Sequence, residues 1–69
     1  MKLSARNNLA GTVVSITKGA TTAHVVLELT PGRTLTASIT NAAVDDLELV
    51  VGMPARAIIK ASDVLVAVD

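Results

Sequence analysis

The chain has 69 residues, with six basic and six acidic side chains, one histidine, and no cysteine, phenylalanine, tryptophan or tyrosine. The lack of cysteine excludes disulfides and cysteine-based zinc sites, and a zero net charge without aromatic side chains argues against a nucleic-acid-binding protein. A domain this small buries only about 60% of the surface that its unfolded chain exposes, so its own core is a marginal source of stability.

Three strands are predicted in the first forty residues. The β-branched run LAGTVVSIT at residues 9–17 is the first, and Lys18-Gly19-Ala20 follows as a turn in which Gly19 is the expected position for a positive φ. TTAHVVLELT at 21–30 is the second. The turn dipeptide Pro31-Gly32 separates it from RTLTASIT at 33–40, the third.

Apolar and polar residues alternate in the second and third segments, which is typical of strands with one face on a core. In 21–30 one face is expected to carry Ala23, Val25, Leu27 and Leu29, and the other His24, Val26 and Glu28. In 33–40, Leu35, Ala37 and Ile39 point one way, while Thr34, Thr36, Ser38 and Thr40 point the other way. We interpret this hydroxyl face as a solvated strand face that could also offer donors to an anion.

The second half of the chain begins with a short predicted helix. NAAVDDLEL at 41–49 favours one or two helical turns, with Asn41 as the N-cap and Asp45-Asp46 near the helix start, where acidic residues complement the helix dipole. ARAIIK at 55–60 predicts a fourth strand. VLVAV at 64–68 predicts a fifth, and because this run does not alternate we expect it to be buried on both faces or to lie in an interface.

This order predicts one all-β domain over residues 1–69, a five-stranded OB-like barrel with one short helix. Apolar residues make up 51% of the chain and the mean hydropathy is +0.59, so we expect an exposed apolar patch and an obligate homo-oligomer. The N-terminus lacks the apolar core of a signal peptide, and no apolar run approaches the roughly 20 residues that span a bilayer. The expectation is a cytoplasmic protein without a membrane partner.

No group of residues predicts catalysis. His24 stands alone on the polar face of its strand, Glu28 and Glu48 are isolated, and Lys18-Gly19 lacks the glycine spacing of a phosphate-binding loop. The chain offers no nucleophile paired with a base and no histidine or cysteine cluster for a metal. We therefore do not expect an enzyme.

What remains is a set of hydrogen-bond donors. Ser4 and Arg6 precede the first strand, Lys60 and Ser62 follow the fourth, and Thr40 closes the hydroxyl-bearing strand. Each alone is more typical of a strand end or a cap. In an oligomer, however, an oxyanion could lie where the two donor groups meet across a subunit boundary.

Several segments, in order, resemble the molbindin (Mop) domain, which also occurs in molybdate-responsive transcription regulators and molybdate transporter ATPases. They are SARN at 4–7, L-x-G-x-V-x-x-I ending at Ile16, KGATTAHVVLEL, T-x-x-I-T ending at Thr40, AVDDLEL-x-x-G and KASDVLVAV. The resemblance covers essentially the whole chain. It implies an OB-like barrel that assembles as a hexamer, a trimer of dimers, and binds molybdate and tungstate at subunit interfaces without an organic cofactor.

The resemblance also implies site residues. Ser4 and Arg6 of one subunit would meet Lys60, Ala61 and Ser62 of a neighbour, with Ala61 contributing its backbone N–H, and Thr40 would add a hydroxyl contact. Asn7 would hold the segment in shape. A second oxyanion site near a three-fold axis would involve Gly19, Ala20, Thr21 and Thr22.

The function expected on this basis is intracellular storage and homeostasis of molybdate and tungstate. A regulatory or scaffolding module that uses the same oxyanion as a signal, through a partner protein, is the alternative. An OB-type oligonucleotide binder is disfavoured by the neutral charge and the missing aromatic residues.

Overall fold

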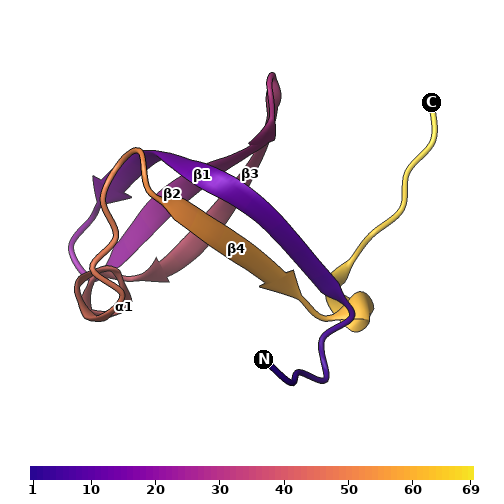
Figure 1. The fold of residues 1–69 in the computed structure, drawn as a ribbon, viewed down its shortest axis with the longest axis horizontal. Coiled ribbons are helices and arrows are strands. Elements are labelled where there is room, and N and C mark those ends of the chain that lie inside the picture. The colour runs from indigo at the N-terminus through magenta and orange to yellow at the C-terminus, as the bar shows by residue number, and fades with distance from the viewer.

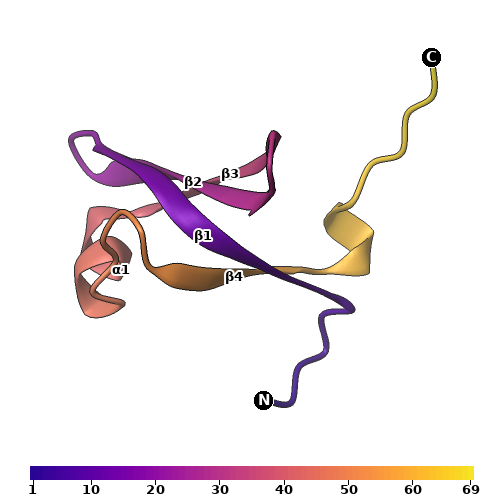
Figure 2. The same cartoon turned by 45° about the horizontal axis from the view of Figure 1, so that its top comes forward.

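The computed structural model describes residues 1–69 as a curled antiparallel sheet with one short helix (Figures 1 and 2). The sheet order is β3-β2-β1-β4. The strands are β1 (Asn7–Lys18), β2 (Thr22–Thr30), β3 (Arg33–Thr40) and β4 (Pro54–Ile59), with helix α1 (Asn41–Asp46) between β3 and β4 and the 3-10 turn η1 (Ala61–Asp63) after β4.

Two local features shape the sheet. The ladder between β1 and β2 shifts register between Val13 and Ser15, and a bulge of this kind bends a strand and increases its twist. At Gly11 a Cβ atom would lie 2.8 Å from the carbonyl oxygen of Glu28, so only glycine fits this close approach of two strands. Together they help to curl the sheet around its apolar face.

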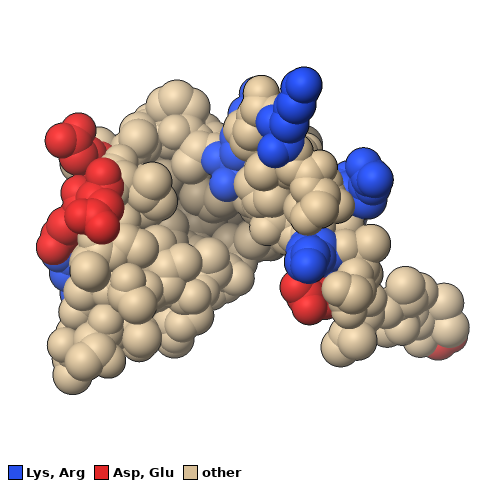
Figure 3. Space-filling view, turned by 90° about the horizontal axis from the view of Figure 1, so that it is seen from below, with Lys and Arg blue, Asp and Glu red and all other residues tan.

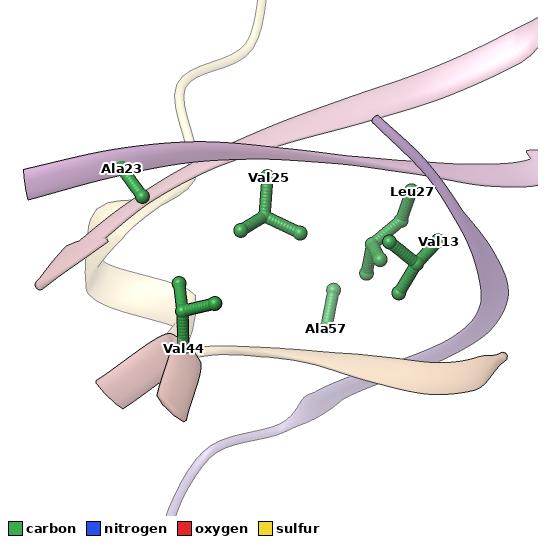
Figure 4. Packing of buried hydrophobic residues seen from close by; sticks show 6 residues of the cluster. All are labelled: Val13, Ala23, Val25, Leu27, Val44 and Ala57. Carbon is green, nitrogen blue, oxygen red and sulfur yellow. The ribbon is translucent and has the colours of Figure 1, made fainter. Parts of the chain in front are cut away.

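The core lies inside this curl and is small (Figure 4). Val13 of β1, Ala57 of β4 and Val44 of α1 point toward a row of side chains from β2. That row consists of Ala23, Val25 and Leu27, which share a face as the alternation predicted, while Leu29 is half-buried at a second irregularity, between Glu28 and Thr30 in the β2–β3 ladder. The outward residues Thr34, Thr36, Ser38 and Thr40 of β3 are exposed.

The helix starts where it was expected but is capped differently. The N-cap is Thr40, whose Oγ1 accepts a 3.0 Å hydrogen bond from the backbone N–H of Ala43, and not Asn41, which is the first helical residue. Both residue types cap well. Thr40 takes the role because it is the last residue of β3, paired with Thr22, so its backbone is still extended at the cap position.

The predicted place of the acidic pair was wrong. Helix α1 ends at Asp46, so the acidic pair occupies its last turn. Only in the first turn would these two carboxylates complement the helix dipole. Asp45 instead accepts a hydrogen bond from the Lys18 ammonium, at 2.7 Å, which links the end of β1 to α1. Glu48, two residues after the helix, has a φ of +53°.

The predicted fifth strand is absent, so the barrel is not closed. Residues 64–68 are extended but pair with no strand, and they project away from the sheet (Figures 1 and 2). A strand requires a neighbour to hydrogen-bond to, and this segment has none within its own chain.

The prediction of a positive φ at Gly19 was wrong. Among the glycines, positive φ angles occur at Gly32, in the β2–β3 turn, and at Gly52. The structure contains no helix with the length and apolarity needed to cross a bilayer.

Candidate oxyanion site

The two donor groups predicted from the sequence lie at the same end of the β1–β4 pair. Antiparallel pairing places Asn7 opposite Ile59, so Arg6 and Lys60 are the residues that flank the last pair of this ladder. Ser4 lies two residues before Arg6, and Ala61 and Ser62 begin η1. We call this region, made of Ser4–Arg6 and Lys60–Ser62, the donor end of the molecule.

The donor end presents positive charge without an ionic partner. Ser4, Arg6 and Lys60 are exposed, and neither cation forms a salt bridge, since the single one in the structure joins Lys18 to Asp45. Figure 3 shows acidic side chains gathered at the α1 side and most basic ones toward the other side of the molecule. Asp63 in η1 is the acidic residue nearest in sequence to Lys60. Two unpaired cations with adjacent hydroxyls form a suitable partner for a small dianion.

Asn7 has the supporting role expected for it. It is half-buried, and its side-chain amide donates a 3.2 Å hydrogen bond to the carbonyl of Ile59. The segment that carries Arg6 is thereby fastened to the strand that leads to Lys60.

Thr40 lies at the other end of the sheet, beside α1 (Figure 1). Within one chain it is therefore not brought together with Ser4, Arg6 or Lys60. Its Oγ1 already accepts from Ala43, so its hydroxyl hydrogen remains free to donate. Any anion that contacts both Thr40 and the donor end must bind between two chains.

The β1–β2 turn forms a second polar region. Gly19 and Thr22 line an open hollow together with Thr17, Lys18 and His24, whereas Ala20 and Thr21 do not line it. The hollow contains no apolar residue. Sequence reasoning missed Thr17, Lys18 and His24 here, although the β1–β2 pairing, which sets Thr17 opposite His24, follows from the turn between the two strands.

Asn41 holds this turn in place. Its side-chain amide donates to the carbonyl of Gly19 at 3.0 Å, and its backbone N–H donates to the carbonyl of Thr21 at 2.9 Å. Its Oδ1 is buried without a hydrogen-bond partner. The residue expected to cap the helix thus joins the helix to the turn.

An apolar groove lies in the gap between the two edge strands, β3 and β4. Nine of its eleven lining residues are hydrophobic. Its floor consists of the core residues Val13, Val25 and Leu27. The rest of its lining comes from β3, the chain between α1 and β4, and the start of β4: Ala37, Ile39, Leu47, Leu49, Met53, Pro54, Ala55 and Arg56.

No three histidine, cysteine, aspartate or glutamate side chains come together as metal ligands in the structure.

The chain is similar in sequence to a known domain family and to curated relatives. Residues 3–66 match the TOBE domain family. A probable molybdenum-pterin-binding protein of Haemophilus influenzae is 48% identical over 69 residues, which cover both chains completely. The molybdenum transport protein ModE of Herbaspirillum seropedicae is 52% identical over 67 residues, and the chain spans only 25% of that relative's length.

Solved structures share the fold. A molybdate-binding protein from Sporomusa ovata superposes with a TM-score of 0.91 at 42% identity, covering 97% of this chain and 98% of that one. The cytoplasmic molybdate-binding protein ModG, in a form with molybdate bound, gives a TM-score of 0.90 at 48% identity over 94% of this chain and 46% of that one.

Proposed function

Because this chain belongs to the molbindin family of TOBE-domain proteins, we propose that it binds molybdate and tungstate at subunit interfaces of a homo-oligomer. Its role is then storage and homeostasis of these oxyanions in the cytoplasm. Its relatives are named for binding or transport and not for a reaction, which supports a protein without catalytic activity. The ligand in this proposal is the free oxyanion, without an organic cofactor.

The observation that carries the proposal is the pairing of Asn7 with Ile59. It gathers Arg6, Lys60 and their neighbouring hydroxyls at one exposed end with no carboxylate bound to either cation. A tetrahedral dianion requires several converging donors, and two cations balance its charge. In the proposed site Ser4 and Arg6 come from one subunit, and Lys60, the backbone N–H of Ala61 and Ser62 come from its neighbour.

Two further elements belong to the proposal. Thr40 reaches the anion from a neighbouring chain, and the β1–β2 turn at Gly19–Thr22 forms a second type of site where three subunits meet. The assembly is a hexamer, a trimer of dimers. Exposed apolar side chains support such an assembly, because monomers rarely leave so many uncovered: Leu3, Leu9, Val14, Leu47, Val50, Val51, Ile58 and the segment from Val64 to Val68.

Calorimetric titration tests the binding. Molybdate and tungstate should bind tightly at more than one site, and sulfate in excess should not compete, since cavity size discriminates between similar oxyanions. Arg6→Ala or Lys60→Ala should abolish the interface sites, while Arg33→Ala, at the β2–β3 turn, is the matched control. Binding that survives both substitutions contradicts the assignment.

Mixing the two variants tests whether the site crosses chains. A pair of chains with reciprocal sites has two sites, each with Arg6 from one chain and Lys60 from the other. After joint refolding of an Arg6→Ala chain with a Lys60→Ala chain, half of the pairs are mixed, and each mixed pair has one intact site. The mixture should therefore regain about a quarter of the wild-type molybdate-binding capacity. If Arg6 and Lys60 of the same chain form the site, mixing restores nothing.

A regulatory module is the second candidate, favoured by one observation. The same kind of sequence forms a quarter of the longer ModE relative, where it is joined to other segments. A pull-down with and without molybdate distinguishes the two functions. A partner retained only with molybdate supports regulation.

A further inference from the structure

Lys18 takes part in two structural features. It lines the open polar hollow at the β1–β2 turn, and its ammonium donates a 2.7 Å hydrogen bond to a carboxylate oxygen of Asp45, in the last turn of α1. Asp45 does not line the hollow. We propose that Asp45 is an internal counter-ion, which binds Lys18 when no anion does and competes with an oxyanion for it. This inference rests on the proposed function, because it concerns the second of the two proposed types of site.

The positive charge of the hollow depends on Lys18. The side chains of the other lining residues form no hydrogen bond within the chain, so their hydroxyls and the imidazole are free to donate to a ligand. Lys18 is the one lining residue with a permanent charge. Because the ion pair neutralises that charge, an anion that enters the hollow must take the ammonium from Asp45. The other lining residues are Thr17, Gly19, Thr22 and His24.

Helix α1 holds the turn and the counter-ion in place beside each other (Figure 1). Asn41, its first residue, donates from its side-chain amide to the carbonyl of Gly19 at 3.0 Å and from its backbone N–H to the carbonyl of Thr21 at 2.9 Å. Asp45 follows one turn later on the same helix. Since the turn is fastened to the helix, an exchange of partners requires only rotation of the flexible Lys18 side chain and no movement of the backbone.

The ion pair is weak enough to open. The Lys18 and Asp45 side chains are 46% and 67% exposed, and exposed ion pairs contribute little to stability. A dianion attracts an ammonium about twice as strongly as a carboxylate does at the same distance. The neighbouring hydroxyls donate to the dianion as well. An oxyanion therefore displaces Asp45, and it binds with an affinity that the competition lowers.

The counter-ion also acts before an anion binds. In the proposed assembly three subunits meet at this turn, which brings three Lys18 ammonium groups toward one another, and like charges repel. Asp45 neutralises each of them. The donor end has no such counter-ion, since neither Arg6 nor Lys60 forms a salt bridge. Asp45 thus stabilises the assembly without its ligand and favours release of the anion from the hollow.

Calorimetric titration with molybdate measures the competition. The titrations use the Arg6→Ala chain, in which the donor-end sites are abolished and the hollow is retained. Adding Asp45→Asn should tighten binding at least about fivefold, because three ion pairs no longer compete for the ammonium groups around one anion. Asp46→Asn is the matched control, since this adjacent carboxylate forms no salt bridge, and it should change the affinity less than twofold.

Lys18→Gln separates competition from simple repulsion between charges. In the Arg6→Ala chain this substitution should weaken molybdate binding at least tenfold. Asp45→Asn should then change the affinity less than twofold, because no ammonium remains to compete for. A gain as large as the one with Lys18 present would mean that Asp45 only repels the anion, and it would overturn the proposal.

The titrations also distinguish this inference from the proposed function. Unchanged or weaker binding after Asp45→Asn would overturn the counter-ion role and leave the second type of site standing. No molybdate binding in the Arg6→Ala chain, with or without Asp45→Asn, would refute the second type of site and the inference with it.

NMR follows the ion pair in the chain that retains Arg6. Saturating molybdate should shift the carboxyl carbon signal of Asp45 toward that of an unpaired aspartate and leave the signal of Asp46 in place. If the amide signals of Gly19 and Thr22 move while the Asp45 signal does not, the anion binds without taking Lys18 from Asp45. That result would also overturn the proposal.

Discussion

The side-chain amide of Asn7 donates to the carbonyl of Ile59 over 3.2 Å, across 52 residues of sequence. This bond closes the β1–β4 ladder at its end, next to Arg6 on one strand and Lys60 on the other. It is the contact that gives the donor end a defined shape, because Arg6 and Ser4 belong to a terminal segment that forms no other side-chain hydrogen bond.

Asn7→Ala should therefore weaken both folding and oxyanion binding. Loss of a half-buried hydrogen bond lowers the free energy of unfolding by about 1 kcal/mol, and loosening Arg6 lowers molybdate affinity about fivefold. Urea denaturation and calorimetry measure the two effects. Asn8→Ala removes an exposed hydrogen bond that Asn8 Oδ1 accepts from Arg56, at 3.2 Å, and should change the molybdate affinity less than twofold. An equal loss of affinity in both variants would contradict the role given to Asn7.

Much of the fold follows from local sequence patterns. The alternation in 33–40 and the Pro31-Gly32 turn identify β3 and its hairpin correctly, because one face of that strand meets the core and Gly32 adopts a φ of +79°. Thr40 and Asn41 are both good caps, so the choice between them depends on where the β2–β3 ladder ends, which is a tertiary property. The segment 64–68 has strand composition, but composition does not supply a neighbouring strand.

The donor end was harder to predict. Ser4 and Arg6 lie more than fifty residues from Lys60 in sequence, and only the β1–β4 register brings them together. Residue types identified the donors, and the molbindin resemblance paired them. The antiparallel register explains why both groups lie at one end of a single chain.

Val13 and Val14 form a matched pair for testing the core. Val13 is fully buried, whereas Val14, its neighbour in the β1 bulge, is 41% exposed. Val13→Ala should lower the free energy of unfolding by about 2 kcal/mol, because it removes buried methyl groups and leaves a cavity. Val14→Ala should lower it by less than about 0.5 kcal/mol. An equally large loss for Val14 would show that a partner covers the outer face of β1.

Thr40→Asp separates the two roles of Thr40. Aspartate caps helices as well as threonine does, so the free energy of unfolding should change by less than about 0.5 kcal/mol. A carboxylate next to the bound dianion should reduce molybdate affinity more than tenfold. Thr40→Ala removes the helix cap, so it should lower the free energy of unfolding by about 1 kcal/mol. Unchanged affinity in Thr40→Asp would remove Thr40 from the site.

Glu48 carries backbone strain that glycine should relieve. Its φ of +53° places a side chain in the left-handed region just after the helix, a position that glycine favours. Glu48→Gly should raise the free energy of unfolding by about 0.5 kcal/mol, as measured by denaturation. Ala42→Gly, at an exposed position inside the helix, should lower it by about 1 kcal/mol. A loss in Glu48→Gly would mean that the Glu48 side chain makes a stabilising contact in the assembly.

Asp63 should limit the affinity of the proposed site. It lies in η1, three residues after Lys60, forms no salt bridge, and places a negative charge close to the donor end. Asp63→Asn removes that repulsion while keeping the size of the side chain, so molybdate should bind about two- to fivefold more tightly, the range expected for one exposed charge. The gain in affinity should shrink as the salt concentration rises, because exposed charges are screened.

Asp46→Asn, on the α1 side of the molecule, is the control for Asp63→Asn and should leave molybdate binding at the donor end unchanged. Weaker binding by Asp63→Asn would mean that Asp63 orients one of the donors, and the charge arrangement proposed for this site would then be wrong.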